Sequence, residues 1–233
     1  MRQLFLDTET TGLAAAQGDR IIEIGIVEMV NRRLTGRTLH HYVNPGRASH
    51  PDALKVHGLT EEFLADKPAF AQIADEIVAF VADAEVIIHN AEFDVGFLDA
   101  EFALLGRGRF ADHVASIVDS LMLAREAYPG KGNSLDALCR RLEVDNTHRE
   151  LHGALLDAGL LAEVYLRMTR GQGSLVIDAG SALHESRDGP AIDLRGFELP
   201  VIEPSDAELA AHEALLADID KASGGKLAWR TMA

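Results

Sequence analysis

Residues 4–13 read LFLDTETTGL, and the rest of the sequence is interpreted outward from this stretch. Its apolar start predicts a strand, and its end carries two carboxylates, Asp7 and Glu9. Because side chains at positions i and i+2 of a strand lie on the same face, Asp7 and Glu9 should project together. Two like charges this close are costly unless a cation lies between them, and the oxygen ligands suit Mg or Mn. Taken alone, the pair also fits a solvated strand end without chemistry.

The hydrophobic pattern predicts an α/β protein. Strands are expected at 4–7, 20–30 and 37–45, with residues 31–36 as a hairpin connection, so the first three strands should form a meander. After a helix cap at Thr60, helical periods and short apolar runs alternate. The expected helices are 69–84, 94–105, 120–128, 134–142 and 153–169, and the expected strands are 85–90 and 115–119. This order predicts a central mixed sheet flanked by helices.

Composition narrows the class of protein. The chain has 37 acidic and 22 basic residues, a formal net charge of -15. This charge argues against a protein that coats nucleic acid or an anionic membrane, so any contact with DNA should be local. Cys139 is the only cysteine, which excludes an internal disulfide and fits a reducing compartment, and we expect it in the core. No apolar run approaches the roughly 18 residues of a membrane span, and we expect a cytoplasmic protein.

The periodicity ends near Arg170. Residues 173–204 contain Gly, Pro and Ser without a sustained period, which predicts a flexible linker. Ser205 and Glu208 then form a capping-box pattern at the start of a last helix, and Gly224 should end it. We therefore predict a folded domain over 1–172, a linker over 173–204 and a partly disordered tail over 205–233 that contains the short helix.

Three further residues could join the acidic pair. Asp94 follows a buried strand near a helix start, where it could face the strand-end site or act only as a helix cap. His152 and Asp157 would lie about 140° apart on one continuous helix, but Gly153 allows His152 to stand in the preceding loop. Although a lone histidine is more often at the surface or in the core, Asp157 interrupts the apolar run ALLDAGLL, where an unpaired carboxylate would be expensive.

If these groups converge, they can perform a specific reaction. Two divalent ions about 4 Å apart would clamp a phosphodiester and activate a water molecule. A histidine beside that water would accept its proton as a general base.

Three stretches resemble the motifs of one enzyme family. LDTETTGL, HNAEFD and LHGALLDA are similar to the three motifs of the DnaQ-type DEDDh exonucleases. The intervening IIEIGIVE and GKGNSLDALCRRLEVDN are similar to the proofreading members of this family that serve bacterial DNA polymerases. The resemblance covers nearly all of residues 1–172. It implies an RNase H-like fold and an exonuclease domain over these residues.

The resemblance also implies roles for individual residues. Asp7, Glu9, Asp94 and Asp157 would hold two Mg or Mn ions, and His152 would be the general base. The substrate-binding residues would be Thr10, Thr11, Gly12, Leu13, His57 and Asn90. His57 could instead be a surface-turn histidine. Asp119 is interpreted as a helix cap and not as a further ligand.

The implied function is 3'–5' proofreading of DNA 3' ends by two-metal phosphodiester hydrolysis, and it carries implied partners. The tail, residues 205–233, would bind the alpha subunit of DNA polymerase III, and a small third core subunit is possible. Gln172, Leu175, Val176 and Ile177 would bind the sliding clamp, unless this stretch is plain linker. Two alternatives stay open: a 3'–5' exoribonuclease of the same fold, and a structural subunit without catalysis. No membrane partner is expected.

Overall fold

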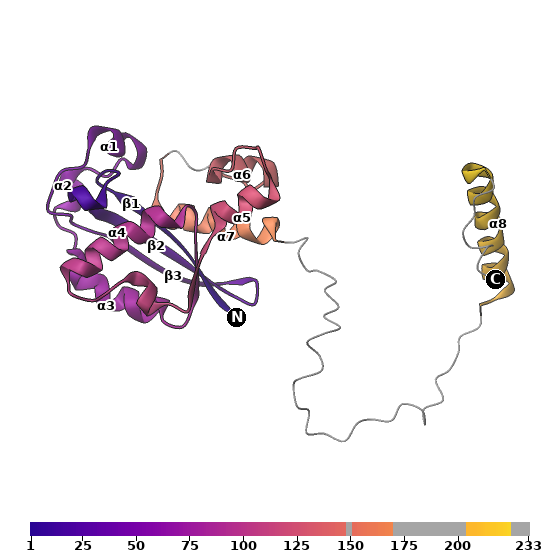
Figure 1. Cartoon of the computed structure of the whole chain (residues 1–233), viewed down its shortest axis with the longest axis horizontal. Helices are drawn as coiled ribbons and strands as arrows, with labels where there is room; N and C mark the ends of the chain where they lie inside the picture. Colours follow the sequence, from indigo (N-terminus) through magenta and orange to yellow (C-terminus); the bar gives the residue numbers. More distant parts are fainter. Residues whose placement is uncertain (148–150, 170–203, 225–233) are drawn as a thin grey trace, which may run out of the picture. The chain divides into compact units, whose positions relative to one another are not determined.

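A computed structural model describes residues 1–147, 151–169 and 204–224 (Figure 1). The chain divides into two units, Met1–Ile177 and Asp178–Ala233, and each is described by itself. The expected clamp motif at 172–177 and all but the last residue of the expected linker lie outside the described residues.

The first unit is built on a five-stranded mixed sheet in the order β3-β2-β1-β4-β5. The strands are β1 (Arg2–Thr10), β2 (Ile21–Val30), β3 (Arg33–Tyr42), β4 (Glu85–Ile88) and β5 (Ser116–Asp119). The first three are antiparallel, whereas β4 pairs in parallel with both β1 and β5. The meander and the mixed sheet expected from the sequence are confirmed. Because β1, β4 and β5 are parallel, their carboxyl ends lie at one edge of the sheet.

Several of the helices begin at residues whose side chains cap them. They are α1 (Pro51–His57), α2 (Glu61–Leu64), α3 (Phe70–Val81), α4 (Ala91–Leu104), α5 (Ser120–Ala127), α6 (Leu135–Leu142) and α7 (Ala154–Met168). Short 3-10 turns lie at Ala15–Gln17 and Phe110–His113. The side chains of Thr60, Asp119 and Ser134 accept backbone N–H groups at the starts of α2, α5 and α6. Helix α1 was not expected, because its seven residues carry no clear apolar period.

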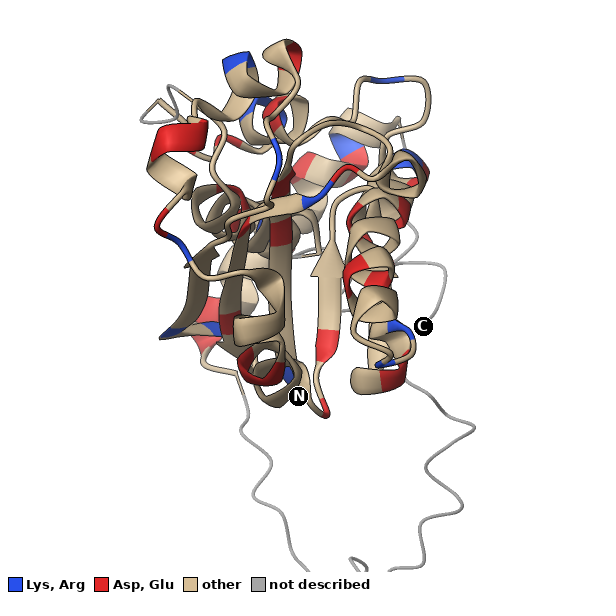
Figure 2. Cartoon of the chain, turned by 90° about the vertical axis from the view of Figure 1, so that its left-hand side faces the viewer, with Lys and Arg blue, Asp and Glu red and all other residues tan. Residues whose placement is uncertain are grey.

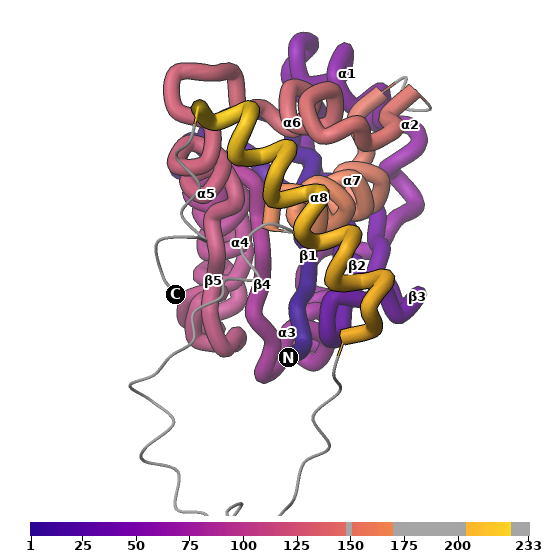
Figure 3. The backbone as a smooth tube through the Cα atoms, turned by 90° about the vertical axis from the view of Figure 1, so that its right-hand side faces the viewer, coloured from indigo at the N-terminus to yellow at the C-terminus, as the bar shows by residue number. Residues whose placement is uncertain are grey.

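Alternate residues of β1 face different helices. Leu4 and Leu6 belong to the core that also contains residues of α3 and α4. Phe5 packs instead with Leu161 of α7, and Figure 3 shows α5, α6 and α7 together in front of the strands. Since Asp7 and Glu9 share the phase of Phe5, they lie on the α7 face.

The connection between β2 and β3 is tighter than expected. Only Asn31 and Arg32 form the turn, with φ of 49° and 62°, and β3 already begins at Arg33. The predicted connection over 31–36 is therefore wrong. Two-residue turns with positive φ match the twist of paired strands, so Thr35 and Gly36 belong to β3, where they lie at an irregularity in its pairing with β2 between Val27 and Met29. Arg32 donates to the carbonyl oxygen of Leu166 at 3.0 Å, which ties the turn to the end of α7.

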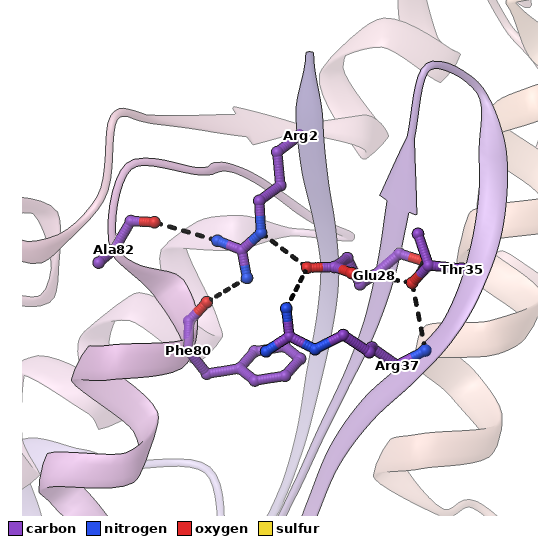
Figure 4. Close-up of polar contacts among 6 residues, drawn as sticks. All are labelled: Arg2, Glu28, Thr35, Arg37, Phe80 and Ala82. Atoms are coloured by element: carbon purple, nitrogen blue, oxygen red, sulfur yellow. Dashed lines mark hydrogen bonds and ion pairs between the residues drawn. The ribbon is translucent and has the colours of Figure 1, made fainter.

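The amino end of β1 is fixed by a buried carboxylate (Figure 4). Glu28 accepts hydrogen bonds from Arg2 at 2.7 Å and from Arg37 at 3.2 Å. Arg2 also donates to the carbonyl oxygen of Phe80 at 2.7 Å, near the end of α3. Burial by itself would raise the pKa of Glu28, but the bonds from Arg2, Thr35 and Arg37 outweigh it and hold the pKa below its usual value. This network joins β1, the β2–β3 hairpin and α3 near the amino end of β1, whereas Glu9 lies near its carboxyl end.

The described part of the second unit is the helix α8 (Asp206–Ser223). Ser205 and Glu208 form the expected capping box, and Gly224 ends the helix in the left-handed conformation. Leu209, Leu215 and Ile219 are exposed on it.

Charged residues are spread over the described elements. In Figure 2 the acidic residues (red) lie on strands and helices alike, with the basic residues (blue) between them. Within the described ranges, no helix combines the length and the apolar character that crossing a bilayer requires. Cys139 is buried in the core between α5, α6 and α7, as expected.

Candidate active site

The last residues of β1 extend beyond their neighbour on one side. Strand β4 pairs with β1 only from Gln3 to Leu6, so Asp7 to Thr10 have no β4 partner. On the other side β2 continues, with Asp7 opposite Gly25 and Glu9 opposite Glu23. Glu9 is 9% exposed and Asp7 is half-buried. The early end of β4 leaves an opening beside the two carboxylates.

Asp94 occupies this opening. Its Oδ1 accepts hydrogen bonds from the backbone N–H of Thr8 at 3.0 Å and from the Thr8 hydroxyl at 2.7 Å. The carboxylate thus pairs with a backbone group on the side where β4 has ended. Burial raises the pKa of Asp94 to about 7, and the two bonds from Thr8 act in the opposite direction. Thr8 was missed by the sequence analysis, although it lies between the two predicted ligands.

Helix α4 begins at Ala91, three residues before the expected start at Asp94. The backbone N–H groups of Asn90 and Ala91 both donate to the carboxylate of Asp119, at 3.2 and 3.3 Å. Asn90 adopts the left-handed conformation with φ of 69°. The same Asp119 carboxylate caps α5, so it fastens two helix starts at the carboxyl edge of the sheet. Its interpretation as a helix cap agrees with these contacts.

His152 and Asp157 come together at the start of α7. Gly153 is the cap of this helix, so His152 stands in the preceding loop, as expected. Its Nδ1 lies 3.4 Å from Oδ2 of Asp157, whose side chain is 3% exposed. Glu9 joins them, because one ligand atom from each of Glu9, His152 and Asp157 lies within 4.8 Å of the others. Three of the five predicted catalytic residues therefore form one cluster, and Thr8 holds Asp94 to the strand between Asp7 and Glu9.

Gly25 determines how closely α7 approaches the sheet. A Cβ atom on Gly25 would lie 2.2 Å from the backbone nitrogen of Leu155 and 2.4 Å from the carbonyl carbon of Ala154. Such distances are far below ordinary contact, so only glycine allows the first turn of α7 to lie here. Gly25 is opposite Asp7, and Asp157 belongs to that first turn. The sequence signal was present, since a glycine inside the apolar strand IIEIGIVE marks a close backbone approach.

A further carboxylate lies beside the cluster. Glu23, opposite Glu9 on β2, is 3% exposed, and its Oε1 lies 2.7 Å from Nε2 of His40. The sequence analysis did not single out Glu23 or His40, because a charged residue inside an antiparallel strand usually faces solvent. The strand ends thus bring several carboxylates onto one small region, which favours the binding of cations.

The turn after β1 is held by its own polar groups. The hydroxyl of Thr10 donates to the carbonyl oxygen of Gly12 at 2.6 Å, and that of Thr11 donates to Asp19 at 3.1 Å. A cavity of about 480 Å³ opens beside this turn and is lined by Gly12, Leu13 and Asp19, among others. Leu13 is 86% exposed, so the structure presents a large apolar side chain to solvent at its rim.

The two other expected substrate residues come from other elements, His57 from the end of α1 and Asn90 from the start of α4. His57 is buried, its Nδ1 accepts a hydrogen bond from Leu59 N–H at 2.9 Å, and burial lowers its pKa. The alternative of a surface-turn histidine is therefore wrong. Its neighbour Val56 lines the 480 Å³ cavity. Asn90 lines a different cavity, on the β5 side of the site.

Comparison with known proteins identifies the family. A family model described as "Exonuclease" matches residues 4–165. The DNA polymerase III subunit epsilon of Escherichia coli (strain K12) is 49% identical over 237 residues, which cover 98% of this chain and 97% of that protein. The chain belongs to the DNA polymerase III epsilon family of exonucleases.

Solved structures agree with the fold. Exonuclease X, in complex with 5' overhanging duplex DNA, is 28% identical with a TM-score of 0.57 and covers 74% of this chain and 93% of its own. The nuclease domain of 3'hExo, described as a DEDDh family member bound to rAMP, has a TM-score of 0.63 at 17% identity. The match covers 73% of this chain and 92% of that one, and it shows the shared fold alone. The RNase H-like fold and the family resemblance are thus confirmed. Membership of the epsilon family implies divalent metal ions as cofactors.

Proposed function

We propose that the chain is the 3'–5' proofreading exonuclease of a DNA polymerase III core, and that Asp7, Glu9, Asp94, His152 and Asp157 carry out the hydrolysis. The exonuclease class follows from family membership. The observation that carries the catalytic assignment is the convergence of Glu9, His152 and Asp157 within 4.8 Å at a strand end.

The donor set fits divalent cations. The cluster consists of carboxylates and one imidazole, and Glu9 and Asp157 are both buried. Buried carboxylates this close repel each other, so a cation between them would lower their free energy. We assign two Mg or Mn ions to Asp7, Glu9, Asp94 and Asp157, because carboxylate oxygens are the preferred ligands of these metals. When bound, such ions would offset the charge of the phosphodiester and increase the acidity of a coordinated water.

His152 has the geometry of a general base. Its Nδ1 faces Oδ2 of Asp157 at 3.4 Å, so the Nδ1 proton is the one directed at the carboxylate. This leaves Nε2 to accept the proton of the attacking water. The side chain is 45% exposed, which gives a substrate access to that atom. The position of His152 in the loop before α7, beside the cluster and half-exposed, supports this role.

The turn after β1 would bind the 3'-terminal nucleotide. Gly12 and Leu13 line one end of the 480 Å³ cavity, and the hydroxyls of Thr10 and Thr11 hold the turn through their bonds to Gly12 and Asp19. A Cβ on Gly12 would lie 2.4 Å from Asp19 and from His50, so the glycine keeps this end of the cavity tightly packed. We propose that the exposed Leu13 packs against the terminal base.

Two expected residues would support the substrate from other elements. His57 is buried and is the chain neighbour of Val56, which lines the 480 Å³ cavity, so we propose that it supports the substrate cleft. Asn90 would contact the DNA strand near the start of α4.

DNA is the substrate we propose, with a replicative polymerase as partner. The E. coli relative is named as a DNA polymerase III subunit, and the exonuclease X structure contains DNA. We propose that residues 1–172 are the exonuclease domain, that 173–204 link it to the tail and that 205–233 bind the alpha subunit. The exposed apolar residues of α8 support the docking of the tail. Residues 172–177 would bind the sliding clamp. A small third subunit could complete the polymerase core. The expected location is the cytoplasm.

One set of substitutions tests the catalytic assignment. Purified full-length chain with Mg or Mn should release mononucleotides from the 3' end of mismatched DNA primers. Asp7→Asn and His152→Ala should each lose most of this activity, whereas Asp83→Asn, the same chemical change in the exposed loop between α3 and β4, should retain it. Full activity in Asp7→Asn would contradict the assignment. Faster hydrolysis of single-stranded RNA than of DNA would favour the exoribonuclease alternative, and inactivity of the unchanged chain would favour the structural subunit.

A deletion tests the division of labour. Removal of residues 178–233 should abolish co-purification with the alpha subunit and preserve hydrolysis of DNA 3' ends. Retained co-purification would contradict the proposed role of the tail.

A further inference from the structure

A second cavity lies at the same edge of the sheet as the active site. It has a volume of about 590 Å³, and its lining includes Asn90, Leu121, Arg125 and Lys131. These residues follow β4, belong to α5, or lie in the loop before α6. Because β1, β4 and β5 are parallel, the residues that follow β4 and β5 lie at the same carboxyl edge of the sheet as Glu9.

The charge of this cavity differs from that of its neighbours. Arg125 and Lys131 are in its lining, which includes no Asp or Glu; the acidic group beside it, Asp119, accepts the backbone N–H groups of the lining residues Asn90 and Leu121. The cavity beside Gly12 contains two aspartates, and a third cavity, between β3 and α7, contains an aspartate and two glutamates. In a chain with a net charge of -15, a cavity with only cationic charged groups favours an anion.

Both cations are available to a ligand. Arg125 and Lys131 are exposed, and no ion pair joins either of them to another described residue. Arg125 has only a 3.7 Å contact from its Nη1 to the sulfur of Met122. A guanidinium and an ammonium on one cavity wall are the groups that proteins use to bind phosphate.

The loop that carries Lys131 is held in place. Arg141 donates to the carbonyl oxygen of Gly132 at 2.8 Å and to Oδ1 of Asn133 at 3.1 Å, and its guanidinium lies over the ring of Tyr128. Nε2 of His89 lies 2.9 Å from the carbonyl oxygen of Asn133. The cavity is therefore formed before any ligand binds, which reduces the entropy cost of binding.

We propose that this cavity binds a phosphate of the single strand upstream of the 3'-terminal nucleotide, through Arg125 and Lys131. The inference rests on the proposed exonuclease function and extends its substrate path from the turn after β1 across the end of β4. A dinucleotide contains only the phosphodiester that is cleaved, so an upstream phosphate is present only in longer substrates.

The test compares substrates of two lengths. Full-length chain with Mn is offered oligothymidylates of two and of five nucleotides, and the length gain is the ratio of kcat/KM for the longer to that for the shorter. The unchanged chain should show a clear gain, because only the pentanucleotide reaches the cavity. In Arg125→Ala/Lys131→Ala the length gain should fall about tenfold, because two charge-assisted contacts are lost. The fall should come from a higher KM for the pentanucleotide. The dependence of log KM on log salt should become shallower by about 0.7 for each phosphate contact removed.

A charge-matched variant separates local binding from net charge. Arg33→Ala/Arg109→Ala also removes two exposed cations, one at the start of β3 and one beyond the end of α4. It should keep the length gain of the unchanged chain.

The outcomes are distinct. A length gain that is undiminished in Arg125→Ala/Lys131→Ala, or equally diminished in the control, overturns the phosphate site and leaves the exonuclease function intact. An unchanged chain without any length gain also overturns it. If the unchanged chain hydrolyses neither oligonucleotide, the proposed function itself fails.

Discussion

Replacing Gly25 with alanine should misplace the catalytic groups of α7 without unfolding the protein. The new Cβ would lie 2.2 Å from the backbone nitrogen of Leu155, whereas ordinary contact begins near 3.4 Å. The difference between these two distances requires the first turn of α7 to move by about 1.2 Å. Asp157 lies in this turn and His152 directly precedes it. A misplacement of about 1 Å costs roughly 100-fold in rate, or about 2.7 kcal/mol of barrier.

The assay measures kcat for release of the 3'-terminal nucleotide at saturating Mn, together with urea unfolding. We expect kcat to fall about 100-fold and the free energy of unfolding to fall by about 1–3 kcal/mol, the usual cost of overpacking. Gly159→Ala is the matched control, because it makes the same change within α7 where a Cβ would meet no atom within 4 Å. It should keep full activity and gain about 0.5–1 kcal/mol of stability. If kcat of Gly25→Ala stays within threefold of the unchanged chain, the close approach does not position the site and the reasoning fails.

Three further predictions concern the carboxylates and the tail. Thr8→Val removes the 2.7 Å bond to Asp94 and should weaken Mn affinity or activity about 10–100-fold, as measured by metal titration; an unchanged affinity would show that the backbone bond suffices. Glu28→Gln should cost about 1–3 kcal/mol in urea unfolding at pH 7. The folded state holds the pKa of Glu28 below its unfolded value, so the ionised Glu28 stabilises the fold above the ordinary pKa of 4.5. This stabilisation is lost as the pH falls below that value. The variant should therefore lose less stability on acidification than the unchanged chain. Leu215→Asp on α8 should weaken binding of the alpha subunit at least tenfold by pull-down titration, whereas undiminished binding would exclude this face of the helix.

Much of the architecture could be predicted because it depends on local periods. The alternation of side chains along a strand is enough to place Asp7 and Glu9 on one face of β1, and the capping box of Ser205 is enough to place the start of α8. The helical starts at Thr60 and Ser134 were predictable for the same reason, since a cap is made within three residues of chain. One boundary was wrong because a distant group completes the local geometry. The start of α4 moved from Asp94 to Ala91, where Asp119 of a later element accepts the N–H groups of the turn.

The sequence by itself determined the chemistry of this protein. Its residue types, their order and the spacing of its motifs indicated carboxylates for metal ions and a histidine for proton transfer. Only the tertiary structure decided how the groups meet. Strand β4 ends at Ile88, which opens the backbone of Thr8 to Asp94, and Gly25 admits the first turn of α7. Both features depend on where one element ends and on how closely another packs against it. The hydrophobic period of a single segment contains no information about either.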